Sequence, residues 1–526
     1  MNTLICAGGS SQRVLASILH LCAAGLGPPE MRVVIVDPDG ANGNGAEVRE
    51  LVDKYVQCQS RFAAGLGTGL NLFGTKLDLL DAEFSTPGLK VWSVVASRDK
   101  LADVINYDNL PSSETPQDVA HLFFTPEEIR MPLDQGFRGH TAVGAAAMSL
   151  VSLSAGDQPW KQIVEKIGQD VTQTGGARVM VVGSVFGGTG ASAIHPLVRF
   201  LRSTPKTNKE RLKIAATALA PYFRFDDSTA APGTQASALA AQAAWFPLRT
   251  RSAVEFYRHL QDNNDFDFDA IYWIGDNAPI PVDYAEGGSR QRNPAHFVDL
   301  LAALAALDFF RQPEAVKGNF YAGSGPNTHR ELAELNVVDW TDLPLRGYTV
   351  DEIRQSALRM VLAGAMHTGF FMPLFQNASI DSDPSCVRWY YQRFARKDDH
   401  LTKHVHSEDL ALLTSFFTDH HLRWWAELTK PKNVFLFNNS AFLGDGSGPS
   451  VVQLDRLRNL QGADSPAERT SEAIDDFVEK MDDVPSSMGG QPGVAGYLSL
   501  LAHASDLYIQ DVYKMTTSKS QTESRR

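Results

Sequence analysis

The chain has 526 residues, 43% of them hydrophobic and 21% charged, which is the composition of a soluble protein with about two to four domains. Its formal net charge of −13 argues against binding to bulk nucleic acid or to an anionic membrane. The four cysteines lack the paired spacing of a metal site, so we expect a reduced, cytoplasmic protein without a structural metal. No apolar run is predicted to span a bilayer.

The N-terminal segment predicts a β-α-β unit of Rossmann type. A short apolar strand at residues 3–6 precedes a glycine turn, a periodic helix at 14–24 and a buried strand at 32–36. The small residues of the turn and the helix start after it suit a diphosphate, although any β-α turn has the same pattern. The candidate residues of this turn are Gly8, Gly9, Ser10, Ser11 and Gln12.

Two carboxylates follow the second predicted strand. Asp37 or Asp39 would accept hydrogen bonds from ribose hydroxyls if the ligand were NAD. The same residues belong to Asp-Pro-Asp-Gly, which is a strong turn sequence, so a turn without a ligand is the alternative. Residues 60–135 are rich in Gly and Pro and are expected to form an insertion, with a helix resuming near 143–153.

A second glycine loop is the most informative stretch of the chain. An apolar, β-branched segment at 177–185 predicts a strand before the loop, and an amphipathic segment at 193–202 predicts a helix after it. Glycines let backbone N–H groups approach an anion, and a helix start adds unpaired donors. The loop lacks the lysine of a Walker A motif and the glycine spacing of a dinucleotide fingerprint. Its candidate residues are Gly187, Gly188, Thr189, Gly190, Ala191 and Ser192.

The following segments continue the alternation of strands and helices. Strands are predicted at 212–220 and 270–274, helices at 236–245 and 252–260, and a long apolar helix at 294–310. This pattern indicates an α/β fold with a parallel sheet covered on both faces.

The chain changes character after residue 345. Helices are predicted at 350–375, 387–395 and 408–428, with one isolated strand at 433–437. We therefore divide the chain into a nucleotide-binding domain at 1–345, a mostly helical domain at 346–480, and a linker, short helix and disordered tail at 481–526.

Residues 187–190, Gly-Gly-Thr-Gly between a strand and a helix, resemble the phosphate loop of the tubulin/FtsZ superfamily. The family loop is Gly-Gly-Gly-Thr-Gly-Ser/Thr-Gly; here Phe186 replaces the first glycine, Ala191 the Ser/Thr and Ser192 the last glycine. The resemblance implies a Rossmann-like tubulin/FtsZ-type domain with a parallel sheet and a central helix, and it covers roughly the first 345 residues.

Two later motifs extend the resemblance. Residues 221–226 resemble the Pro-Phe-x-Phe-Glu of FtsZ with one extra residue, and Asp226 takes the place of the acid that holds the ribose. The predicted helix after Asn293 resembles the family's central helix, whose N-terminus faces the base. The resemblance therefore places Asn293 and His296 at a purine, while Asn293 as a plain helix N-cap is the alternative.

The resemblance also assigns the terminal phosphate. Arg138 occupies the place, in chain order, of a family loop that contacts this phosphate, although the family uses small residues there. A solvent-exposed arginine at a helix start is the alternative.

Hydrolysis in the family depends on a loop after the central helix, Asn-x-Asp-x-x-Asp, that orients the attacking water. Asp339 and Asp342 keep the spacing of the two acids, but Asn336 lies one position too far away. A rival alignment uses His296 and Asp299 and lacks the first acid.

The resemblance implies a divergent bacterial tubulin-like protein that binds GTP or GDP with Mg²⁺, with ATP left open. Its expected output is a GTPase cycle that controls self-assembly, or docking of a protein partner on the helical C-terminal region. One alternative is a scaffold that binds nucleotide without turnover in a multi-protein bacterial system such as phage defence. Another is a NAD-dependent oxidoreductase built on the first β-α-β unit.

Overall fold

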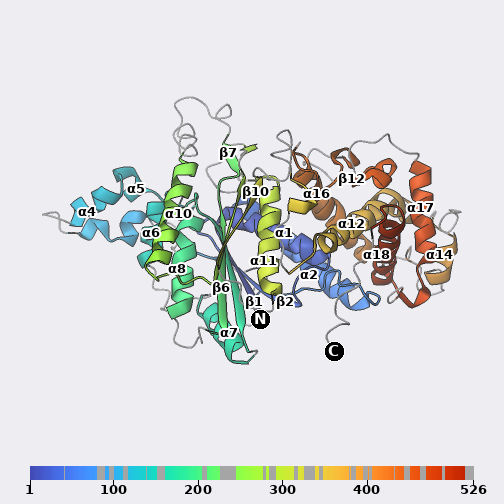
Figure 1. Ribbon diagram of the computed structural model, residues 1–526, viewed down its shortest axis with the longest axis horizontal. Coiled ribbons are helices and arrows are strands. Elements are labelled where there is room, and N and C mark those ends of the chain that lie inside the picture. Colours follow the sequence, from blue (N-terminus) through green and yellow to red (C-terminus); the bar gives the residue numbers. More distant parts are fainter. Residues whose placement is uncertain are drawn as a thin grey trace.

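The computed structural model covers the chain from Met1, and its N- and C-terminal halves lie side by side along the long axis (Figure 1). The structure describes residues 1–515 apart from 41, 80–88, 90, 94–99, 111–115, 135, 138, 151–159, 174, 204–209, 226–244, 277–279, 283–291, 313–317, 325–337, 343–346, 378–379, 381–386, 395–400, 402–405, 432, 444–450, 462–469 and 489–491.

One parallel sheet forms the centre of the N-terminal half, as the alternating pattern predicts. Its strand order is β10-β8-β6-β5-β1-β2-β3, with β4 also paired to β2, and every neighbouring pair is parallel. In the centre, Ile5 lies opposite Val34 on one side and Val181 on the other. The strands are β1 (Asn2–Ala7), β2 (Glu30–Val36), β3 (Lys76–Asp78), β4 (Val91–Trp92), β5 (Ala177–Ser184), β6 (Leu212–Leu219), β8 (Ala270–Asp276) and β10 (Gly318–Ser324).

Helices cover both faces of the sheet because its strands are apolar on both sides. On β1, Leu4 and Cys6 join the core with α1 (Gly9–Ala23), α2 (Gly43–Phe62) and α11 (Phe297–Arg311). Ile5 and Ala7 point the other way, toward the second core. The helices of that second face are α6 (Thr141–Leu150), α7 (Trp160–Gln173), α8 (Thr189–Ser203) and α10 (Phe246–Asp262) (Figure 1).

Part of the segment expected to be an insertion belongs to the sheet. Strands β3 and β4 lie within residues 60–135 and extend the sheet beside β2. The rest of this segment carries the short helices α3 (Leu101–Val104), α4 (Pro116–Phe123) and α5 (Pro126–Arg130) at one end of the molecule (Figure 1).

The long apolar helix starts three residues later than predicted. His296, rather than Asn293, is the N-cap of α11: its side chain accepts a hydrogen bond from the Val298 N–H, and its own N–H donates to Asp299. This reciprocal pair satisfies two N–H groups at the helix start, which explains the boundary.

The C-terminal half is mainly helical. The run α12 (Val350–Met366), η8 (His367–Phe371) and α13 (Met372–Gln376) is continuous, as is α15 (Ser407–Ser415), η10 (Phe416–His421) and α16 (Leu422–Thr429). Both η segments are π-helical. Further elements are α14 (Val387–Arg393), β11 (Phe442–Leu443), β12 (Val451–Val452), α17 (Thr470–Asp483) and α18 (Val494–Asp511).

Three expectations for this half need revision. The predicted strand at 433–437 is wrong, because Val434 forms a single isolated bridge with Val338. The short helix expected after residue 480 is the 18-residue α18, which is largely buried. The run Val350–Gln376 is long and apolar enough to cross a membrane, yet 61% of its most apolar window is buried in the fold. Burial in the core accounts for that composition.

The C-terminal half packs directly on α1 and α2, and one hydrophobic core continues across the junction. His20 of α1 stacks on Trp424 of α16 with ring centroids 4.7 Å apart, and the Trp424 indole N–H donates to Ser17 Oγ at 3.2 Å. Movement of α1 would therefore disturb α16 as well.

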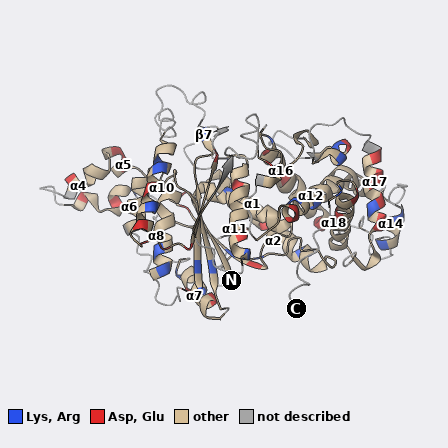
Figure 2. Cartoon of the chain, viewed as in Figure 1, with Lys and Arg blue, Asp and Glu red and all other residues tan. Residues whose placement is uncertain are grey.

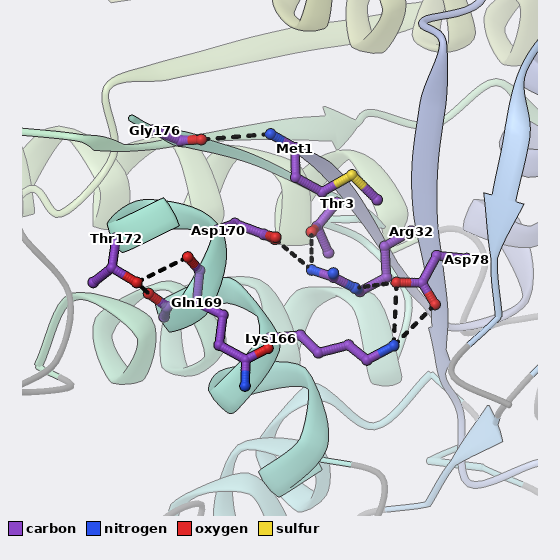
Figure 3. Close-up of polar contacts among 10 residues, drawn as sticks. Met1, Thr3, Arg32, Asp78, Lys166, Gln169, Asp170, Thr172 and Gly176 are labelled. Carbon is purple, nitrogen blue, oxygen red and sulfur yellow. Dashed lines mark hydrogen bonds and ion pairs between the residues drawn. The ribbon is translucent and has the colours of Figure 1, made fainter. Parts of the chain in front are cut away.

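A buried ion network fixes the amino edge of the sheet (Figure 3). The Arg32 guanidinium, 4% exposed, donates to Asp78 Oδ2 at 2.9 Å and to Asp170 Oδ2 at 2.7 Å. It also donates to Thr3 Oγ1, while Lys166 contacts Asp78. These residues come from β1, β2, β3 and α7, so the network joins the sheet to a covering helix. The network lies at the amino edge of the sheet and does not involve its carboxyl edge.

Candidate functional site

The strand order places a topological switch point at the carboxyl edge of the sheet. After β1 the chain continues through α1 to β2 on one side, whereas after β5 it continues through α8 to β6 on the other. The loops after β1 and β5 therefore diverge, and ligands of open parallel sheets bind at such a reversal. Both predicted glycine loops lie here, and they touch: a Cβ added to Gly8 would lie 3.2 Å from Thr189 Cβ.

The first loop requires glycine at its centre. Gly8 has φ +79°, a region that side chains other than glycine rarely occupy, and its N–H donates to the Val36 carbonyl at 2.9 Å. Among the described residues, no side chain caps this end of α1. The first turn begins with the half-buried Gly9 and Ser10 and carries no charge. Its N–H groups and the positive end of the helix dipole therefore suit an anion.

The second loop forms the start of α8, whose first turn, Thr189 to Ser192, is uncharged as well. Gly190 packs so closely that an added Cβ would lie 2.6 Å from the Ser184 nitrogen. Gly187 and Ala191 are half-buried and form the accessible part of the loop. The Ser192 hydroxyl and the Ser192 N–H both donate to the Gly188 carbonyl, at 2.8 and 3.2 Å, so Ser192 offers no backbone donor to a ligand.

A third loop, residues 136–140, covers the second one. Phe137 is buried, and a Cβ on Gly188 would lie 2.8 Å from Phe137 Cβ. Thr141, at the start of α6, donates its hydroxyl to the Gly187 carbonyl at 3.3 Å. Arg138 belongs to this loop in sequence but lies outside the described residues. The described residues of the third loop and Thr141 therefore pack against the second glycine loop.

Gln12 has a partner within the protein. Its Nε2 donates to Asp37 Oδ2 at 2.8 Å, and the Asp39 N–H donates to Asp37 Oδ1 at 3.1 Å. Asp37 is 3% exposed, and this burial raises its pKa to about 7. The side chain predicted to donate to a phosphate therefore holds the carboxyl group at the end of β2.

Asp37→Asn should increase the free energy of unfolding near pH 8 by about 2–4 kcal/mol and have little effect near pH 4. In the folded protein the carboxyl group keeps its proton up to about pH 7, whereas the unfolded chain loses it near 4. This group's contribution to stability therefore falls as the pH rises between these values, and asparagine removes the loss. Urea denaturation across this range, with the exposed α2 residue changed by Asp53→Asn as control, measures it. The same difference at every pH would contradict the assignment.

A buried polar network that the sequence interpretation missed lies beside the first loop. Arg13 of α1 donates to the Tyr222 hydroxyl, and its Nε lies 3.4 Å from Asp299 Oδ2 on α11. Tyr222 in turn donates to Asp299 Oδ1 at 2.8 Å. A charged residue inside an otherwise apolar helix, as at 13 and 299, is the signal that could have revealed it.

His296 adjoins this network. Its Nε2 lies 3.5 Å from Asp276 Oδ2 at the end of β8, and burial followed by the nearby Arg13 charge lowers its pKa to about 3. The imidazole is therefore neutral at physiological pH. Asp226, the predicted ribose acceptor, lies outside the described residues.

A cavity of about 70 Å³ opens between the two halves, next to the first loop. Arg13, Ala16 and His20 line it from the same stripe of α1 that begins with Gly9, one turn above Arg13. Asn293 also lines it, and its N–H donates to Asn44 Oδ1 at 3.0 Å. The remaining lining residues are Asn44, Glu47, Val48, Leu51, Ala295, Asp419, His420, Arg423, Trp424 and Glu427.

The two predicted catalytic acids lie in the 3-10 turn η7 (Trp340–Asp342) and at its start. Asp339 Oδ1 accepts hydrogen bonds from the Thr341 N–H at 2.7 Å and from the Thr341 hydroxyl at 2.5 Å. Asp339 therefore stabilises its own turn, which follows the Val338 bridge to the C-terminal half. The side chain of Asp342 lies outside the described part of the chain.

Within the described ranges, no group of three or more His, Cys, Asp or Glu side chains is arranged to hold a metal ion. No protein-family model matches this chain, and no curated protein matches it either.

Proposed function

We propose that this chain is a tubulin-like protein that binds a purine nucleotide, with GTP as the first candidate. The observation that carries the proposal is the meeting of two uncharged helix N-termini, those of α1 and α8, at the reversal of the strand order. Such a pair offers N–H donors and two dipoles to one polyphosphate. The residues that would contact it through their backbone are Gly9, Ser10, Ser11, Gly187, Gly188, Thr189, Gly190 and Ala191, whereas the Gly8 N–H is already bonded to the Val36 carbonyl.

The base would lie at the cavity between the two halves, which at about 70 Å³ would have to widen to hold a purine. Asn293 and Asn44 lie at its wall, and the Glu47 carboxylate offers acceptors that suit the N–H groups of a guanine edge. Glu47 already pairs with Arg423 at 3.3 Å, so a bound guanine would compete with that ion pair. Mg²⁺ would neutralise the phosphates rather than occupy a cage of side chains.

A second candidate, a scaffold that binds nucleotide without hydrolysing it, is favoured by the position of Asp339. Its carboxylate is engaged with Thr341 in its own turn, so water activation would require that turn to rearrange. In both readings, nucleotide binding would control self-assembly or the docking of a partner on the helical half. NAD is a weaker ligand candidate, because Gln12 and the Asp39 N–H already occupy Asp37.

Calorimetric titration with GTP, ATP and NAD in the presence of Mg²⁺ tests the proposal. Thr189→Arg should abolish binding by filling the loop, because Thr189 is 8% exposed and touches Gly8. Ala191→Asp is the cleaner variant: a carboxylate in the first turn of α8 favours the helix dipole but repels phosphate. We expect the affinity for GTP to fall at least about tenfold, while the melting temperature of the protein stays unchanged.

Thr172→Arg, at an exposed threonine near the end of α7, is the matched control and should bind as the wild type does. Failure of the wild type to bind any of the three ligands would refute the proposal. Binding that survives both Thr189→Arg and Ala191→Asp would place the ligand elsewhere. Preferential binding of NAD would favour the oxidoreductase reading.

A further inference from the structure

One end of the molecule exposes apolar side chains on two helices. Eleven large hydrophobic residues of the described chain are at least about a third exposed, and seven of them lie on α4 or on α10 and its N-cap. Leu122 is 80% exposed, Phe123 66% and Leu248 50%. A concentration of this kind, on a protein that otherwise buries its apolar residues, indicates an interaction surface.

The exposed residues of α4 lie on one stripe, as do three of the four on α10 and its N-cap; Val254 lies on the opposite side of α10. Val119, Leu122 and Phe123 of α4 have the spacing i, i+3, i+4. On α10 the matching stripe runs from the N-cap Trp245 through Leu248 to Phe256, with the spacing i, i+3, i+11. We call these six residues the end patch. Apolar stripes of this kind are typical of helices that pack against other helices.

The charges beside the two stripes are complementary (Figure 2). Helices α8 and α10 carry five arginines and two acids, whereas α4 and α5 carry three acids and one arginine. Arg251 and Arg258 are exposed on α10, and Asp118 begins the α4 stripe. The chain has a net charge of −13, so two copies repel each other over most of their surfaces. The acidic α4 of one copy and the arginine-rich α10 of the other do not repel each other.

We infer that the end patch is a homodimer interface in which α4 of each copy packs on α10 of its partner. In Figure 1, α4 lies at the outer end of the N-terminal half, and α10 lies beside α8 on the same flank of the sheet. In a two-fold dimer each α4 would pack on the other copy's α10, and the two equivalent contacts would close the assembly. The end patch does not include the residues that line the cavity, whereas Phe246 in the first turn of α10 packs on Phe186, beside the second glycine loop, with ring centroids 4.7 Å apart.

Sedimentation velocity and light scattering of the full chain test the inference. The wild type should dimerise, and Leu122→Asp and Leu248→Asp should each raise the dissociation constant at least about tenfold. Phe435→Asp is the matched control: Phe435 is 52% exposed but lies in the C-terminal half, so its replacement should leave the dimer intact. Circular dichroism verifies that each variant is folded.

Cysteine pairing tests the geometry of the interface. Under oxidation, a mixture of Leu122→Cys and Leu248→Cys proteins should form a covalent dimer, whereas either protein alone should form far less. A monomeric wild type would overturn the inference. So would a dimer that persists in both aspartate variants, one that Phe435→Asp dissolves, or equal cross-linking by a single cysteine protein. Binding of an unrelated protein by a monomeric wild type would assign the patch to a different partner.

Discussion

Arg13→Met should lower the free energy of unfolding by about 3–5 kcal/mol, which is a large part of the stability of a typical domain. The guanidinium is 8% exposed and contacts both the Tyr222 hydroxyl and the fully buried Asp299. Methionine keeps much of the side-chain volume but leaves the Asp299 carboxylate without its cation. Burial already raises the pKa of Asp299, so the variant protein is expected to bind a proton there. Urea denaturation at neutral pH measures the loss.

A second substitution separates charge from packing. Arg13→Met with Asp299→Asn should recover much of the loss, because asparagine is neutral and still offers an acceptor to the His296 N–H. The control is Arg61→Met, which breaks an exposed ion pair with Asp409 and should cost less than about 1 kcal/mol. Equal losses for Arg13→Met and Arg61→Met would show that the buried network adds nothing to stability.

The sequence predicted the sheet better than the elements around it. The strands expected at 3–6, 177–185 and 212–220 match β1, β5 and β6 because long β-branched runs between glycine turns allow few other structures. Helix α2 was missed since it starts with glycines at 43 and 45, and its cap comes from the Asn42 side chain. Strand β10 was not predicted, because its residues show little alternation and pair with β8 only through the tertiary fold.

The candidate site was likewise predictable from the sequence only in part. The glycine loops were predictable because each directly follows a strand, and parallel strands bring their carboxyl ends to one edge. The network of Arg13, Tyr222 and Asp299 was not, since its members are 209 and 77 residues apart in sequence. The cavity also depends on α16 of the C-terminal half, whose packing on α1 no local pattern indicates.

The cavity makes the helical half part of the candidate site. Glu427 of α16 accepts a hydrogen bond from the Ala295 N–H at 2.8 Å, next to Asn293, and Arg423 pairs with Glu47 of α2. A base that displaces the Glu47 pair would therefore act directly on α16. The ion pair between Arg423 and Glu47 would therefore link a nucleotide bound at the cavity to the helical half, on which the proposed partner would dock.

The second large effect expected is acid unfolding. Burial lowers the pKa of His296, His367 and His421 to about 3, from an ordinary value near 6.5. The unfolded chain takes up these protons below about pH 6.5 while the folded protein does not, so stability is present above this pH and is lost as the pH falls. Near pH 4 each histidine costs about 3 kcal/mol.

In the part of the chain that the structure describes, His296 has an acid nearby, Asp276, but the Arg13 charge beside it opposes protonation of the imidazole. His421 faces the buried His20, whose pKa is lowered well below its ordinary value by burial first and then by the His421 and His420 charges. His367 is held by the Tyr497 and Thr414 hydroxyls. These histidines, with His20 acting in the same direction, weaken the folded state as the pH falls toward 4. The raised pKa values of Asp37 and Asp299 act in the opposite direction, because burial favours the protonated carboxyl groups in the folded protein. We expect the histidine loss to be the larger of the two, since it comes from four buried imidazoles.

We therefore expect the protein to unfold near pH 4, and His421→Phe to shift the acid midpoint downward without lowering stability near pH 7.5. Phenylalanine fits the aromatic surroundings, where His421 stacks on Phe416 with ring centroids 5.8 Å apart. It removes about 3 kcal/mol of the acid loss because it cannot bind a proton. Acid titration followed by tryptophan fluorescence measures the midpoint, with His259→Phe on the exposed face of α10 as control. An unchanged midpoint in His421→Phe, or a wild type that keeps its unfolding free energy down to pH 4, would rule out this cluster as the cause.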